Sequence, residues 1–153
     1  MKTILRGSIL FFLFVFSLPG FLRATDIDSL KIEPLRNKAG QSSIYVLQFS
    51  LADTVSVTAQ WKITFPAGFN LGKVKMAGSN NIKGGFTTLV NGSDVIISRT
   101  GRGAALEAGR MYRIMLANVT NASSGTYEIS VSASDKKGDP PGAVKSATVV
   151  ILP

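Results

Sequence analysis

The chain of 153 residues contains no cysteine and no histidine, and it has only nine carboxylates. Without cysteine there is no disulfide framework, no thiolate nucleophile and no cysteine ligand for zinc. Without histidine the commonest general base and metal ligand are missing. The carboxylates at Asp53, Asp94, Glu107 and Glu128 fall at strand ends, in loops or on an exposed strand face, whereas a glycosidase needs two that face each other. The sequence therefore argues against an enzyme and predicts no cofactor.

Long apolar runs are confined to the beginning of the chain. Lys2 and Arg6 precede an apolar segment from Ser8 to Leu18, and Pro19-Gly20 follows it. This pattern predicts a secretory signal peptide over residues 1–24, cut after Ala24. An uncleaved membrane anchor is the alternative, since the segment has about the minimum length for a bilayer. A lipoprotein anchor is excluded because there is no cysteine to acylate. We expect a secreted or cell-surface protein.

Residues 25–153 form one predicted domain of moderate positive charge. Without Lys2, Arg6 and Arg23 it has 14 cations against nine acids, a net charge of +5. The cations are scattered, so no polybasic tail is present and nucleic acid is not an expected partner. We expect no membrane insertion after signal cleavage. The sequence leaves open whether this is a whole small protein or the first module of a longer one.

A period of two governs the pattern after residue 25. Residues 55–65 alternate apolar and polar side chains, so Val55, Trp61 and Phe65 are predicted to share one face of a single long strand. Asn91-Gly92-Ser93 predicts a hairpin turn. Other short strands are predicted around 30–33, 45–51, 73–76, 86–90, 94–98, 111–117, 127–134 and 143–151. Residues 104–108 would form one helical turn at most. We predict an all-β, antiparallel sandwich of about seven to nine strands.

The stretch ITFPAGFN, residues 63–70, contains the residues that are predicted to end the long strand. Proline cannot donate to a central sheet ladder, so Pro66 is predicted to end the strand. Gly68 permits a tight reversal. Phe69 is then predicted to fold back and plug one end of the sandwich, which is a structural role without catalytic use.

Three segments carry a family resemblance: Ala39 to Phe49, Trp61 to Phe69, and Leu116 to Asn121 followed by Gly125-Thr126-Tyr127. In this order and spacing they resemble the immunoglobulin-like β-sandwich modules of secreted and surface-attached prokaryotic proteins. The resemblance covers most of residues 28–151. One departure is Val119 after Asn118, where that family often has proline or glycine. The resemblance implies a structural, spacer or adhesive module, and it transfers no catalytic residue.

Arginines gather in one part of the sequence, at Arg99, Arg102, Arg110 and Arg113. If the strands that hold them pair, the four guanidiniums share one edge. Guanidinium binds phosphate and carboxylate bidentately, so an acidic surface polymer is a candidate partner. The alternative is a charged edge that prevents aggregation of strands.

The sequence gives less support to a metal site or to a sugar-binding site. Asp26, Asp28, Asp135 and Asp139 lack the spacing of an EF-hand, and Lys136-Lys137 opposes a cation. We interpret them as a polar tail and a solvated turn and predict no metal site. Trp61 and Tyr127 fall on apolar strand faces, where core packing is the default for an aromatic residue.

These observations converge on an exported, non-catalytic, structural or adhesive sandwich module. The alternative is a binding module for an acidic or carbohydrate polymer through the arginine edge. The expected partner is accordingly a surface polysaccharide or another surface protein. The sequence leaves the oligomeric state open.

Overall fold

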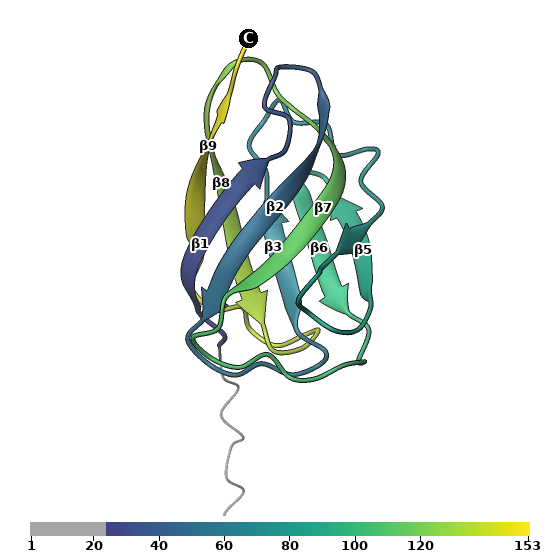
Figure 1. Ribbon diagram of the computed structural model, residues 1–153, viewed down its shortest axis with the longest axis vertical. Helices are drawn as coiled ribbons and strands as arrows, with labels where there is room; N and C mark the ends of the chain where they lie inside the picture. The colour runs from purple at the N-terminus through teal and green to yellow at the C-terminus, as the bar shows by residue number, and fades with distance from the viewer. Residues whose placement is uncertain (1–23) are drawn as a thin grey trace, which may run out of the picture.

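Two antiparallel sheets packed face to face make up the computed structural model, which describes residues 24–153 (Figure 1). The signal peptide predicted over residues 1–24 lies outside the described residues except for Ala24. One sheet has the order β1-β2-β7-β4, and the other has the order β5-β6-β3-β8-β9. Between residues 24 and 153 there is no helix long and apolar enough to span a bilayer. The predicted all-β sandwich is confirmed.

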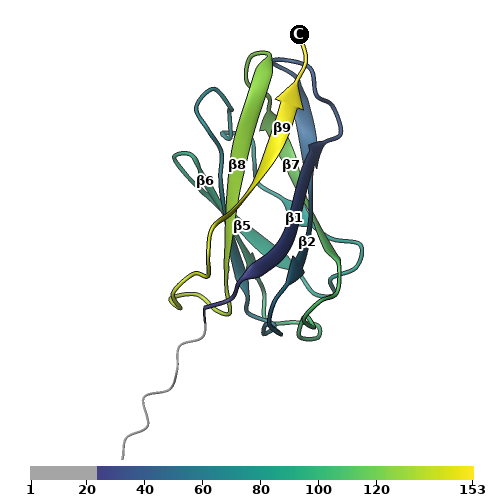
Figure 2. The same cartoon turned by 90° about the vertical axis from the view of Figure 1, so that its left-hand side faces the viewer.

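Nine strands build these sheets. Their bounds are β1 Ile27–Pro34, β2 Ser42–Leu51, β3 Gln60–Thr64, β4 Ala77–Gly78, β5 Phe86–Asn91, β6 Asp94–Arg99, β7 Tyr112–Thr120, β8 Gly125–Ser134 and β9 Lys145–Ile151. β1 and β9 belong to different sheets and lie beside each other at one corner (Figure 2). The first described residues and the C-terminus lie at opposite ends of the sandwich (Figures 1 and 2).

The apolar side chains at alternate positions of the strands form the core. Trp61 and Ile63 of β3 are buried, and the rings of Trp61 and of Phe49 in β2 lie 5.5 Å apart. Each strand buries alternate side chains because successive residues point to opposite faces of a sheet. The inner faces cover each other, which supplies the main stabilisation of a chain without disulfides.

The corner after β3 follows the sequence prediction. β3 ends at Thr64, before Pro66, and Gly68 has a φ of 97° that favours glycine. Phe69 returns to the core, where its ring lies 5.1 Å from Tyr127 and 5.5 Å from Phe65. The predicted role of Phe69 as an end plug is confirmed.

Two strand predictions were wrong. Residues 55–59 do not begin the long strand: Val55 forms an isolated bridge with Leu106, and a turn follows before β3 starts at Gln60. Residues 73–76 form no strand, because Val74 donates its N–H to Leu71 in a turn, and β4 begins at Ala77 instead. In both places the side chains alternate in polarity, but only isolated hydrogen bonds reach the neighbours: Ala59 accepts from the Arg99 N–H, and Met76 accepts from the Ala117 N–H.

The buried side-chain amide of Asn121 connects β2 and the loop between β1 and β2 with the turn after β7. The Asn121 side chain accepts a hydrogen bond from the Tyr45 hydroxyl at 2.6 Å and donates to the carbonyl oxygens of Arg36 and Lys38, each at 2.8 Å. Burial raises the pKa of Tyr45, which keeps the hydroxyl protonated as a donor. The loop between β1 and β2 is thereby fixed to the turn after β7.

We predict that Asn121→Ala lowers the free energy of unfolding by about 3 kcal/mol, since it leaves a buried hydroxyl and two carbonyls unpaired. Urea unfolding measures the loss. Asn80→Ala is the control, because Asn80 is exposed, and it should change stability by less than about 0.5 kcal/mol. Equal stability of the two variants would contradict the assignment.

Candidate binding groove

The four predicted arginines do not share one edge. Arg99 ends β6 in one sheet, whereas Arg113 lies in β7 of the other sheet, so their strands do not pair. Arg102 and Arg110 are exposed in the loop between those strands. The condition for a common guanidinium edge is therefore not met.

Arg99 is buried, with 5% of its surface exposed. Its guanidinium donates to the carbonyl oxygens of Ser56 at 2.8 Å, Lys83 at 3.1 Å, Arg102 at 3.4 Å and Ala104 at 2.6 Å. Burial lowers the pKa of the guanidinium from its ordinary value. Arg99 thus holds the loops before β3, before β5 and after β6 together, and it is not free to bind a polymer.

The alternation in β6 explains this position. Val95, Ile97 and Arg99 have the same parity, and all three are buried, while Ile96 and Ser98 point to the outer face. The parity was a sequence signal for an inward arginine. The other arginines face solvent: Arg110 pairs with Glu107 at 3.1 Å, and the Arg113 guanidinium lies against the amide of Gln48.

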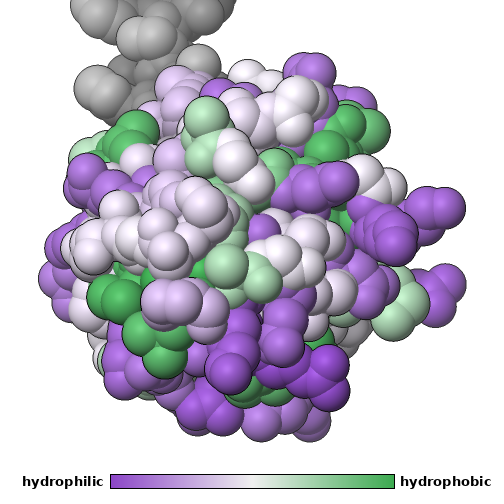
Figure 3. All heavy atoms as spheres, turned by 90° about the horizontal axis from the view of Figure 1, so that it is seen from above, coloured by the Kyte–Doolittle hydropathy of each residue, from purple (hydrophilic) through white to green (hydrophobic). Residues whose placement is uncertain are grey.

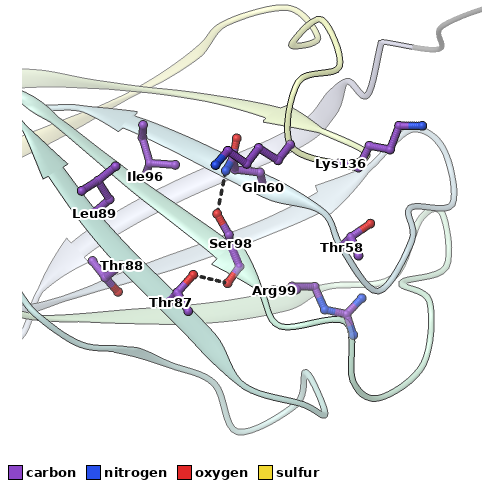
Figure 4. Close-up of a pocket in the computed structure, with 10 residues that line it drawn as sticks. Thr58, Gln60, Thr87, Thr88, Leu89, Ile96, Ser98, Arg99 and Lys136 are labelled. Carbon is purple, nitrogen blue, oxygen red and sulfur yellow. Dashed lines mark hydrogen bonds between the residues drawn. The ribbon is translucent and has the colours of Figure 1, made fainter.

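The outer face of the sheet formed by β5, β6, β3 and β8 is hollowed. A groove of about 600 Å³ runs over β5, β6 and β3 and reaches the loop after β8 (Figure 4). A second hollow of about 170 Å³ adjoins it and shares Gln60 and Ile96 as lining residues. We call the two together the outer groove. The larger part is lined by Thr58, Gln60, Thr87, Thr88, Leu89, Ile96, Ser98, Arg99, Lys136 and Lys137.

Hydrogen bonds across the strands order the floor of the outer groove. The Gln60 amide nitrogen donates to the Ser98 hydroxyl at 2.6 Å, and the Thr87 hydroxyl donates to the Ser98 carbonyl at 3.5 Å (Figure 4). Leu89 and Ile96 add apolar surface, and Leu89 is 62% exposed. The floor therefore combines fixed polar groups with accessible aliphatic side chains.

The loop after β8 forms the basic wall. Asp135 accepts a hydrogen bond from the Ser56 N–H at 2.5 Å, and the Ser56 hydroxyl donates to the Asp135 carbonyl at 2.8 Å. These bonds hold the loop against the one before β3, while Lys136 and Lys137 line the outer groove. In the sequence these lysines indicated only that a cation would be opposed there. Their position was not predictable from spacing because it depends on contacts 79 residues apart.

A carboxylate occupies the opposite side of the same face. Asp94 lies 2.9 Å from the Lys62 ammonium and accepts a hydrogen bond from the Thr64 hydroxyl at 2.7 Å. Hydrogen bonds from Lys62 and Thr64 lower the pKa of Asp94. Within residues 24–153 no group of three His, Cys, Asp or Glu side chains comes together as a metal site would require.

The end of the sandwich that carries the C-terminus also exposes aliphatic side chains, among them Leu35, Ile44 and Leu152. Hydrophobic residues there form separate patches among hydrophilic ones (Figure 3). The outer groove differs from that end because it combines a hollow with polar groups fixed by hydrogen bonds, and it is the candidate site that the geometry favours.

Comparison with known proteins informs the fold. No protein-family model and no curated protein matches this sequence. Among solved structures, a cohesin module from a Clostridium perfringens family 33 glycoside hydrolase has a TM-score of 0.56 at 18% identity, with 84% of this chain and 95% of that chain covered. BslA, described as a bacterial hydrophobin, has a TM-score of 0.50 at 18% identity, with 84% and 98% covered. The collagen-binding subdomain of the Enterococcus faecalis surface protein ACE has a TM-score of 0.45 at 9% identity, with 79% and 95% covered. The likeness to the first two supports a shared β-sandwich fold alone.

We predict that Arg99→Ala lowers the free energy of unfolding by about 3 kcal/mol, because four carbonyls lose a charged donor. Arg102→Ala, at an exposed position, should cost less than about 0.5 kcal/mol. Urea unfolding of both variants decides the matter. If Arg99→Ala were as stable as the wild type, the Arg99 guanidinium would not stabilise the loops that it contacts.

Asp94 gives a prediction about pH. The pKa of Asp94 is lower in the folded state than in the unfolded state. Its contribution to the free energy of unfolding is therefore complete above the ordinary carboxyl pKa of about 4, and it disappears as the pH falls through the pKa of the folded state. The contribution is below about 1 kcal/mol, since the partner lysine is half-exposed. Asp94→Asn should therefore be less stable than wild type at pH 7 and equal to it near pH 2. A constant difference in thermal midpoint across that range would contradict this explanation.

Proposed function

We propose that this chain is an exported, non-catalytic binding module that attaches to a protein partner through the outer groove. The observation that carries the proposal is the groove itself, a hollow of about 600 Å³ with an ordered polar floor, exposed aliphatic side chains and a lysine wall. Such a mixture matches the core and rim of a protein interface. The likeness of the fold to a cohesin module supports a role as a module rather than as an enzyme.

The chemistry of the outer groove favours protein over neutral sugar. Its lining contains no aromatic side chain on which a sugar ring would stack. Lys136 and Lys137 would attract acidic residues of the partner and raise the association rate. Export at the predicted signal and an immunoglobulin-like form of the sandwich belong to the same proposal. Both rest on the sequence pattern.

Binding of an acidic polymer remains a second proposal, with a changed set of residues. Arg102, Arg110 and Arg113 keep their guanidiniums at the surface or partly exposed. Arg110 and Lys83 line a hollow of about 380 Å³ beside Met111. The specific observation is that these two cations line one hollow, together with the Glu107 carboxylate that pairs with Arg110. Loss of binding to an anionic polysaccharide in the Lys83→Ser, Arg110→Ser double variant would support this second candidate.

The test of the main proposal uses matched surface variants as immobilised bait for the exported fraction of the source organism. The groove variant combines Leu89→Ser, Lys136→Glu and Lys137→Glu. The control combines Met76→Ser, Lys73→Glu and Lys75→Glu, which change the same chemistry at exposed positions away from the outer groove. We expect one protein to bind wild type and control alike, and to bind the groove variant about tenfold less or weaker still. Equal retention by all three baits would contradict the proposal.

A further inference from the structure

The end of the sandwich that carries the C-terminus holds most of the net positive charge of residues 25–153. Two connections meet there: residues 35–41 between β1 and β2, and residues 65–76 between β3 and β4. Leu152 bonds to the first of them through the Asn37 carbonyl. The two connections contain no acidic residue and four exposed cations, Arg36, Lys38, Lys73 and Lys75. The other ten cations of residues 25–153 are almost balanced by nine acids.

Both connections are anchored to the end of β7. Asn70 of the second connection exchanges two backbone hydrogen bonds with Thr120, each at 3.0 Å. Asn121, the next residue, holds the first connection because its side chain donates to the carbonyls of Arg36 and Lys38. The four cations therefore project from loops that are fixed beside each other.

Exposed aliphatic side chains form a row between these cations. The Leu35 N–H donates to the Ile44 carbonyl at 2.9 Å, and the Met76 carbonyl accepts the Ala117 N–H of β7 at 3.1 Å. Ile44 precedes the buried Tyr45, so it lies on the outer face of its sheet. The exposed fractions of Leu35, Ile44 and Met76 are 65%, 37% and 67%. Three strand spacings of about 4.8 Å make this row roughly 14 Å long.

The cations flank the row at both ends, since Arg36 follows Leu35 and Lys75 precedes Met76. Glu33, the acid that precedes Leu35 in β1, is paired with Lys31 at 2.9 Å. Viewed from this end, hydrophobic patches lie among hydrophilic ones (Figure 3). We call the following residues the cationic end: Leu35, Arg36, Lys38, Ile44, Lys73, Lys75 and Met76.

This composition suits an anionic bilayer better than a protein partner. Protein interfaces are depleted in lysine and enriched in aromatic residues. Three of the four cations here are lysines, and the exposed large hydrophobic residues of the described chain include no aromatic one. A bilayer surface instead gains from any aliphatic side chain that reaches the acyl boundary and from each lysine or arginine beside an anionic headgroup.

We propose that the cationic end rests on the surface of a bilayer that contains anionic lipids. Leu35, Ile44 and Met76 reach the boundary between headgroups and acyl chains, and the four cations contact headgroup phosphates. No strand crosses the bilayer, so the contact is peripheral. The outer groove belongs to the other sheet and stays open to a protein partner. The inference stands independently of the proposed function, because no residue of the cationic end lines the outer groove.

Co-sedimentation with vesicles tests the contact, using the protein isolated from the exported fraction. One set of vesicles contains phosphatidylcholine alone, and the other contains phosphatidylcholine with about 30% phosphatidylglycerol. We expect the wild type to bind the anionic vesicles about tenfold more tightly than the neutral ones. Added salt should weaken this binding, because it screens the exposed charges.

Two variants of equal net charge form a matched pair. The first combines Met76→Ser, Lys73→Glu and Lys75→Glu at the cationic end, and it should bind the anionic vesicles about tenfold less or weaker still. The second combines Leu89→Ser, Lys136→Glu and Lys137→Glu in the outer groove, and it should stay within about threefold of the wild type. Circular dichroism spectra that match the wild type exclude misfolding of either variant.

A further variant separates the aliphatic contribution from the charge. Leu35→Ser with Met76→Ser keeps all four cations and should bind the anionic vesicles about fivefold less, because two side chains no longer enter the bilayer. A wild type that ignores the vesicles, or that binds both kinds alike, would overturn the proposal. So would an equal loss in the two matched variants. Capture of an acidic protein by the cationic end, without vesicle binding, would replace the bilayer by a protein partner.

Discussion

Mutual burial of two apolar sheet faces is the interaction on which the rest of this structure depends. No disulfide supports the chain, and no metal cluster forms among residues 24–153. Tyr45, Phe49, Trp61 and Phe65 fill the space between the sheets, and all are almost completely buried. Because this core occupies one face of each strand, the opposite faces remain polar and accessible. The outer groove is a direct consequence of that division.

Buried polar residues turn the sandwich into a precise scaffold. Asn121 fixes the loop between β1 and β2, and Arg99 fixes three loops at the other side of the core. Each residue satisfies backbone carbonyls that regular strand pairing leaves free. Arg99 bonds the Ser56 carbonyl, and Ser56 in turn bonds Asp135 at the base of the basic wall, so this wall is fixed within the chain itself.

Local alternation predicted much of the fold, but it did not predict long-range pairing. It correctly assigned the inner face of β3 and the end of that strand before Pro66, because both depend on neighbouring residues. It failed at residues 55–59 and 73–76, where polarity alternates but turns interrupt the backbone and only isolated hydrogen bonds reach the neighbouring strands. For Arg99, residue type suggested the surface, whereas its parity with Val95 and Ile97 indicated the interior. The outer groove was beyond prediction because it joins β5, β6, β3 and the loop after β8.

The central claim is that the outer groove, rather than the opposite sheet, is the binding surface. Site-specific photo-crosslinking tests it most directly, with the photoreactive side chain placed at Lys136 in the groove wall or at Met115 on the outer face of the other sheet. The account predicts a covalent adduct with a protein other than this chain from position 136 only, in the exported fraction of the source organism. An adduct from position 115 alone, or no adduct from either position, would contradict it.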